Sequence, residues 1–127
     1  HSIRLSGRDV IYKRAINLIA KNWLTGVGIS GDKRYLGMYP HNIFLEILIH
    51  FGVVLGGVLS LLLMYLIIKL LCLAFKNEKQ GFLFIIFCLG IVPLMFSSSY
   101  IGNAWFWIFI GFSMKAIKDS RVNIQLR

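Results

Sequence analysis

The pattern of apolar and polar positions divides the chain into a mixed first third and three long apolar segments. These segments cover residues 43–75, 81–96 (extendable to 100) and 101–117, and short polar connections separate them. A helix needs about 20 apolar residues, at about 1.5 Å each, to cross a hydrocarbon core of about 30 Å. The pattern therefore predicts an all-α polytopic membrane protein, with about three transmembrane helices and a cytoplasmic tail in residues 43–127.

The first apolar segment is too long for one straight crossing. Either its first two turns project from the bilayer, or the helix tilts or breaks near Gly52, Gly56 and Gly57. We favour projection, because that part of the segment contains the ionisable residues Glu46 and His50.

Residues 1–42 are predicted to form an extracytoplasmic loop that contains an amphipathic helix. Apolar residues recur at helical spacing, which predicts a helix from about Arg8 to Leu24 with a basic polar side. Lysine and arginine are equally frequent on the two predicted faces of the membrane. The positive-inside rule is strongest for basic residues near helix ends and in short loops, and these residues lie on the face opposite residues 1–42. This favours an extracytoplasmic location for residues 1–42.

Composition supports a membrane protein. The chain has 127 residues, 57% of them hydrophobic, and a net charge of +9. In a soluble protein such a charge would indicate binding to nucleic acid. Here the basic residues lie between and beyond the apolar segments, which favours binding to phosphate groups or lipid headgroups instead. Because the chain begins with His1 and has no signal-peptide pattern, we expect a piece of a longer protein whose upstream transmembrane helices are missing.

The stretch "GVGISG" at residues 26–31 formally matches the dinucleotide-binding pattern GxGxxG. That motif requires a strand before it and a helix opening on it. Here a predicted helix precedes it and the charged turn "DKRY" follows, so we exclude nucleotide binding. The glycines are predicted to end the helix and to turn the chain.

Three ionisable residues lie close together in "PHNIFLEILIH". Glu46 and His50 are four residues apart and face each other on a helix, either as a satisfied structural pair or as a functional one. His41 and His50 are nine apart and point to nearly opposite sides, so they do not share an ion. We therefore predict no metal site and no cofactor.

His41 follows Pro40 at the predicted water boundary, beside Asn42. A neutral imidazole there accepts a proton near neutral pH, although a capping or interfacial role fits equally well. Arg8, a bidentate phosphate ligand, lies on the same predicted face of the membrane. A phosphate-binding group, a candidate base and a lipid surface together suit chemistry on a phosphorylated lipid.

An ordered set of short motifs carries a family resemblance. The set comprises "SGR" (6–8), "LTGVGIS" (24–30), "PHNIFLEIL" (40–48) and "FGVVLGG" (51–57). In this order and spacing the chain resembles the carboxy-terminal part of the O-antigen polymerase and O-antigen ligase family of bacterial membrane glycosyltransferases, and the two later apolar segments match by hydropathy alone. The resemblance implies a multi-pass protein of the bacterial inner membrane. Its active site would face the periplasm or the cell exterior.

The resemblance also implies a substrate and a site. A sugar chain on undecaprenyl pyrophosphate would pass to an acceptor sugar hydroxyl without metal or cofactor. Arg8 would neutralise the pyrophosphate and His41 would orient or deprotonate the hydroxyl, with Asn42 and Glu46 supporting His41. Because further arginines of the family belong to upstream loops, we expect this piece alone to be inactive.

Three functions remain open at this point. The first is a polysaccharide polymerase that joins lipid-linked repeat units. The second is an O-antigen ligase that moves the finished chain to lipid A core. The third is a membrane transporter that uses Glu46 and His50 as a proton relay. The expected partners of the enzyme are the undecaprenyl-pyrophosphate-linked oligosaccharide, membrane lipid and the missing upstream helices.

Overall fold

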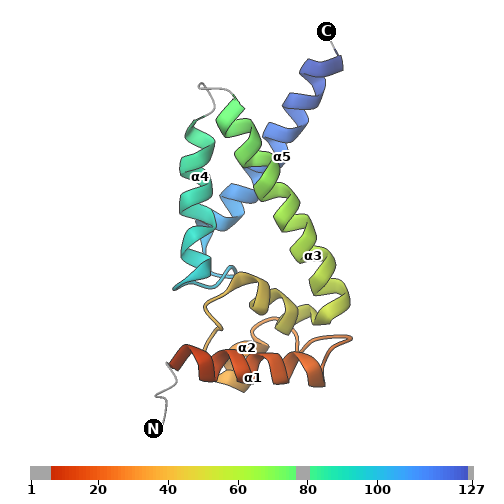
Figure 1. The fold of residues 1–127 in the computed structure, drawn as a ribbon, viewed down its shortest axis with the longest axis vertical. Helices are drawn as coiled ribbons and strands as arrows, with labels where there is room; N and C mark the ends of the chain where they lie inside the picture. The colour runs from red at the N-terminus through yellow and green to blue at the C-terminus, as the bar shows by residue number, and fades with distance from the viewer. Residues whose placement is uncertain (1–6, 77–80, 126–127) are drawn as a thin grey trace. The chain divides into compact units, whose positions relative to one another are not determined.

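The computed structural model describes residues 7–76 and 81–125, with side chains up to residue 120. Ser6 of the "SGR" motif and the connection 77–80 lie outside this part. Every regular element within it is helical, so the predicted all-α class is confirmed. The elements are α1 (Gly7–Lys21), α2 (Gly31–Leu36), α3 (Ile43–Lys76), α4 (Phe82–Gly90), the 3-10 helix η2 (Val92–Met95) and α5 (Ala104–Gln125) (Figure 1).

Helix α3 is broken at Gly52. The backbone of Gly52 has φ 76° and ψ 179°, which is not helical, so residues 43–51 and 53–76 form two separate helical segments. Gly56 in the second segment packs against the first, since a Cβ built on Gly56 would lie 3.0 Å from the carbonyl oxygen of Ile47. The break that the sequence offered as an alternative to projection is therefore present, at the first of the three candidate glycines.

Helix α3 is the one helix in the described ranges that is long and apolar enough to cross a membrane. The segment after Gly52 measures roughly 36 Å at about 1.5 Å per residue, close to a hydrocarbon core of about 30 Å. Much of its apolar surface is exposed, including Val53, Val54, Leu55, Val58, Leu61, Leu62, Met64, Tyr65, Ile68 and Phe75.

The second apolar segment of the sequence forms two short elements. Helix α4 ends at Gly90, and Pro93 lies in the 3-10 helix that follows. Proline lacks the N–H that a continuing α-helix requires, so the change of helix type at Pro93 has a local cause. Residues Phe82–Met95 together form a shorter apolar helical stretch.

Contacts divide the chain into two compact units, His1–Ser60 and Leu61–Arg127. This division describes packing and not the side of the membrane, so the predicted boundary between 42 and 43 stays a prediction. In the first unit α1 packs on α2. The predicted helix 8–24 is found as α1 but ends three residues earlier, at Lys21. The buried apolar residues of this unit are Ala15, Ile43, Ile47 and Ile49.

In the second unit α4 packs along α5 (Figure 1). Gly90 allows the two helices to approach closely, because a Cβ at that position would lie 2.6 Å from Cβ of Phe109 and 2.9 Å from the carbonyl oxygen of Trp105. Asn103 starts α5, and its side-chain oxygen accepts hydrogen bonds from the backbone N–H groups of Trp105 (3.0 Å) and Phe106 (3.3 Å).

Candidate functional site

The loop that follows α1 supplies the hydrogen bonds that the broken helix lacks. The N–H of Val27 donates to the carbonyl oxygen of Ile49 at 2.8 Å, and the N–H of Gly28 donates to that of His50 at 3.0 Å. In return, the N–H of Val53 donates to the carbonyl oxygen of Trp23 at 2.6 Å. A break in a helix frees such groups, and buried backbone groups require partners. Docking of this loop therefore stabilises the break.

Gly26 and Gly52 make the docking possible. Both have left-handed backbones, with φ of 67° and 76°. A Cβ on Gly26 would lie 2.5 Å from the backbone nitrogen of Gly52, and a Cβ on Gly52 would lie 2.7 Å from the carbonyl oxygen of Leu24. The predicted turn at these glycines is present, and "GVGISG" also has a second role, as a backbone-docking loop.

The docked loop leads into α2, whose Asp32 is buried beside His50. Oδ1 of Asp32 lies 2.9 Å from Nε2 of His50. Glu46, one turn before His50 in α3, joins this pair, and one ligand atom from each of the three residues lies within 4.8 Å of the other two. All three residues are 1% exposed. Glu46 and His50 share one face of α3, as their spacing predicts.

The two buried carboxyl groups of this cluster favour a positive charge beside them. Removing carboxylates from water is costly unless they are paired. Oδ2 of Asp32 is fully buried and accepts no hydrogen bond from the described residues. The cluster can therefore hold a proton on His50 or a cation between its oxygen and nitrogen atoms.

Asp32 is the residue that sequence reasoning missed. The sequence predicted it to lie in a charged turn, "DKRY", and this prediction is wrong, because these residues are helical and belong to α2. The prediction of no metal site rested on His41 and His50, which are nine residues apart. No local periodicity links Asp32 to Glu46. The docking of the glycine loop on the helix break brings the two residues together, and this is a tertiary contact without a spacing signal.

His41 lies immediately before α3 in a left-handed conformation, with φ 54°. This region is uncommon for residues with a side chain and costs on the order of 1 kcal/mol or more. Nδ1 of His41 is buried and makes no hydrogen bond within the described part of the chain. The ring packs edge-on against Tyr39, with centroids 4.7 Å apart. His41 thus combines a strained backbone with a ring nitrogen, Nδ1, that makes no hydrogen bond to the described residues.

Asn42, predicted to support His41, is the N-cap of α3. Its side-chain oxygen accepts hydrogen bonds from the backbone N–H groups of Phe44 (3.0 Å) and Leu45 (3.3 Å). Its carbonyl oxygen accepts the N–H of Glu46 at 3.0 Å. Asn42 therefore fixes the point at which α3 begins, directly after His41.

The four predicted site residues do not form one cluster of direct contacts. Glu46 belongs to the buried cluster, and His41 and Asn42 form the entry to α3. Arg8 is exposed in the first turn of α1. Among the described residues no hydrogen bond or ion pair links Arg8 to His41.

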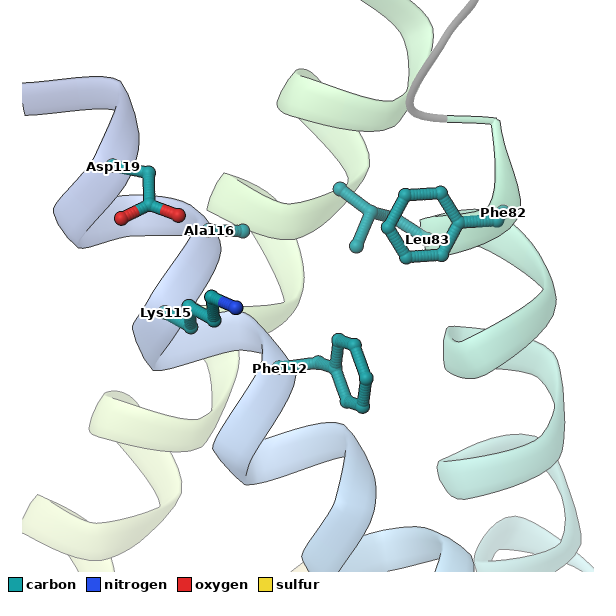
Figure 2. A pocket seen from close by; sticks show the side chains of 6 residues that line it. All are labelled: Phe82, Leu83, Phe112, Lys115, Ala116 and Asp119. Atoms are coloured by element: carbon teal, nitrogen blue, oxygen red, sulfur yellow. The ribbon is translucent and has the colours of Figure 1, made fainter. Parts of the chain in front are cut away.

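A separate cavity of about 230 Å³ lies in the second unit between α4 and α5. Figure 2 shows the rings of Phe82 and Phe112 facing this cavity, with centroids 6.4 Å apart. Leu83, Lys115, Ala116 and Asp119 complete its lining. Lys115 and Asp119 are exposed and four residues apart, which is an ordinary arrangement on a helix surface. This cavity contains none of the predicted site residues.

Comparisons of the chain with models of protein families, with curated proteins and with solved structures give no match.

Proposed function

We propose that the chain is the carboxy-terminal part of a bacterial membrane glycosyltransferase, a polysaccharide polymerase of the O-antigen polymerase and ligase type. It would transfer a glycan from undecaprenyl pyrophosphate to an acceptor sugar hydroxyl. The observation that carries the proposal is the state of His41, with a left-handed backbone and a buried nitrogen that makes no hydrogen bond in the described residues.

A strained backbone persists only where its surroundings enforce it, and such residues concentrate at functional sites. Tyr39 holds the ring of His41 from one side, and the Asn42 cap fixes the start of α3 behind it. An imidazole held in this way is suited to accept the proton of an acceptor hydroxyl as that hydroxyl attacks the sugar.

The charge of α1 supports the lipid-linked donor. Four cationic side chains of this helix are exposed, those of Arg8, Lys13, Arg14 and Lys21. A leaving pyrophosphate gains negative charge in the transition state, and a guanidinium binds phosphate oxygens through two hydrogen bonds at once. Arg8 is the one arginine of α1 that lies in a family-like motif, and we assign it to the pyrophosphate.

The exposed apolar surface of α3 supports a membrane location. Exposed apolar patches of this extent are rare on soluble monomers. In the proposed enzyme α3 spans the bacterial inner membrane, residues 1–42 lie outside the cytoplasm, and the stretches 81–100 and 101–117 form further crossings in company with upstream helices.

The test uses the full-length protein, reconstituted in lipid with a lipid-linked repeat unit as its substrate. Wild type is expected to build a glycan ladder, and Arg8→Ala and His41→Ala are expected to leave the repeat unit unextended. Lys13→Ala, which removes a neighbouring cation of α1, is the matched control and is expected to retain the ladder. Each variant is checked for membrane insertion and helicity.

The outcomes separate the candidate enzymes. A ladder that is indifferent to both changes contradicts the assignment of Arg8 and His41. If wild type instead moves a preformed chain onto lipid A core in one step, the protein is a ligase that uses the same chemistry.

A transporter is the second candidate, and the buried cluster favours it. Interrupted membrane helices with ionisable residues at the break form the ion sites of many transporters. A transporter is expected to lose activity on Glu46→Gln and His50→Gln and to tolerate Arg8→Ala. The enzyme is expected to lose activity on Arg8→Ala.

A further inference from the structure

We propose that Asp32, Glu46 and His50 bind a divalent transition-metal cation, Zn²⁺ or Mn²⁺, which fastens α2 to the broken helix α3. This goes beyond the proposed glycosyl transfer and does not rest on it. The sequence predicted no metal site, because His41 and His50 point to nearly opposite sides of a helix. It gave no indication that Asp32 lies beside Glu46 and His50.

The geometry of the three residues suits a common ion. Ligands bound at about 2.0–2.2 Å lie roughly 3–4 Å from one another around a metal. The ligand atoms here lie within 4.8 Å of one another, so a contraction of roughly 1–2 Å in the longest separation would bring them into one coordination shell. Oδ2 of Asp32, which accepts no hydrogen bond from the described residues, supplies an oxygen with free bonding capacity.

The negative charge of the cluster also favours a bound cation. Asp32 and Glu46 are each only 1% exposed, and when ionised they carry two buried negative charges. A proton on His50 would offset one of these charges, whereas a divalent cation offsets both. Buried carboxylates are stable when they are paired in this way or when they coordinate a metal.

The type of ligand narrows the choice of ion. Carboxylate oxygens suit Mn²⁺, and imidazole nitrogen suits Zn²⁺ and other later transition metals. Zinc sites that keep one position for water hold the metal through three protein ligands, which in some enzymes combine histidine with a carboxylate.

The position of the ion gives it a defined role. Asp32 lies in α2, and Glu46 and His50 lie in the segment of α3 before Gly52. An ion between them would close the connection from α2 to α3, the stretch that contains Tyr39, His41 and Asn42. Binding of the ion is therefore expected to order this stretch.

The experiment measures the number of metal ions bound per chain in the full-length protein, which carries no affinity tag. The protein is purified in detergent, stripped with EDTA, incubated with Zn²⁺ or Mn²⁺ and dialysed, and bound metal per chain is measured by mass spectrometry. Asp32→Asn and Glu46→Gln preserve size but replace a charged carboxylate ligand with a neutral, weaker amide oxygen, and His50→Gln removes the imidazole nitrogen. The matched controls are Asp119→Asn for a carboxylate and His41→Gln for an imidazole.

Wild type and both controls are expected to retain one equivalent of metal per chain more than each cluster variant. If a cluster variant still retains metal, its affinity for the metal is expected to be at least about tenfold weaker than that of wild type. If wild type retains no more metal than Asp32→Asn, the proposal is overturned.

A second measurement on wild type covers the case in which the variants do not fold. Binding to the folded state alone raises its thermal midpoint, so the midpoint is expected to rise with added metal, to keep rising with the logarithm of free metal beyond one equivalent and to fall again with EDTA. A midpoint that does not respond to metal also overturns the proposal.

Discussion

Gly26 and Gly52 meet backbone to backbone, and neither position has room for a Cβ atom. One glycine belongs to the loop after α1 and the other to the break in α3. Their contact aligns the carbonyl oxygens of Ile49 and His50 with the N–H groups of Val27 and Gly28. The fold of the first unit depends on this contact, and so does the position of Asp32 beside His50.

Gly26→Ala is expected to destabilise the first unit by several kcal/mol, because it adds a steric clash to the cost of about 1–2 kcal/mol for an alanine in a left-handed backbone. Gly28→Ala separates these two effects. Gly28 has φ 82°, but a Cβ there meets no atom within 4 Å, so the backbone cost alone applies.

Gly57→Ala is the control without clash or strain, since Gly57 lies inside the helix with open space around it, and it is expected to stabilise the helix by up to about 1 kcal/mol. Equilibrium unfolding in detergent, followed by circular dichroism, gives the free energy for each variant. Equal losses for Gly26→Ala and Gly28→Ala would show that the close approach at Gly26 contributes nothing.

Asp32 and His50 are expected to be coupled in stability. Removing one partner of a buried charged pair typically costs about 3–5 kcal/mol, because the other partner is left without compensation. The double variant Asp32→Asn, His50→Gln should therefore lose less free energy of unfolding than the two single variants together, by about 1–3 kcal/mol.

The control cycle pairs His50→Gln with Asp119→Asn, a carboxylate of the second unit. Here the two losses are expected to add within about 0.5 kcal/mol. A cycle with no coupling between Asp32 and His50 would contradict the 2.9 Å pairing of Oδ1 with Nε2.

Asn42→Ala is expected to cost about 1 kcal/mol of stability through loss of the helix cap, and Asn42→Asp should restore most of it, because aspartate caps as well as asparagine does. Asn103 makes the same two hydrogen bonds at the start of α5. Asn103→Ala should therefore cost a similar amount.

Transfer activity gives a second readout for Asn42. If Asn42 supports His41 only by fixing the start of α3, Asn42→Asp retains the activity of wild type. An inactive but stable Asn42→Asp variant would show instead that the amide of Asn42 has a chemical role.

Leu62→Arg is expected to impair membrane insertion of α3. Leu62 is exposed in the middle of the apolar segment after Gly52. An arginine near the centre of a bilayer costs about 2.5–3.5 kcal/mol on insertion scales. Insertion is measured by glycosylation of acceptor sites placed on either side of α3, with Leu62→Phe as control. Full insertion of Leu62→Arg would contradict the assignment of α3 as a membrane span.

The sequence was informative where structure is local. Helical periodicity predicted α1, and hydropathy predicted α3. The glycines at 52, 56 and 57 offered a break in α3 as an alternative, although projection of its first two turns was favoured. The sequence did not show which of these glycines takes a left-handed φ, because that depends on the loop that docks there. It did not indicate that Asp32 belongs with Glu46 and His50, since this placement results from the contact of Gly26 with Gly52.

In the candidate site, too, the sequence predicted local features but not those that depend on tertiary contacts. The proximity of Glu46 and His50 follows from their helical spacing. The left-handed backbone of His41 has no sequence signature, because histidine adopts this region more often than most residues with a side chain but still uncommonly. The capping role of Asn42 was available from residue type alone.

His41 is the residue on which the proposed function depends, and chemical rescue tests it most directly. His41→Gly removes the imidazole and accepts φ 54° without strain, so it should preserve the fold. In the full-length protein in lipid, we expect this variant to extend the lipid-linked repeat about 10²–10⁴-fold more slowly than wild type. Added imidazole should restore part of the rate. A His41→Gly variant that builds the ladder at the wild-type rate would contradict the role of His41 as the base.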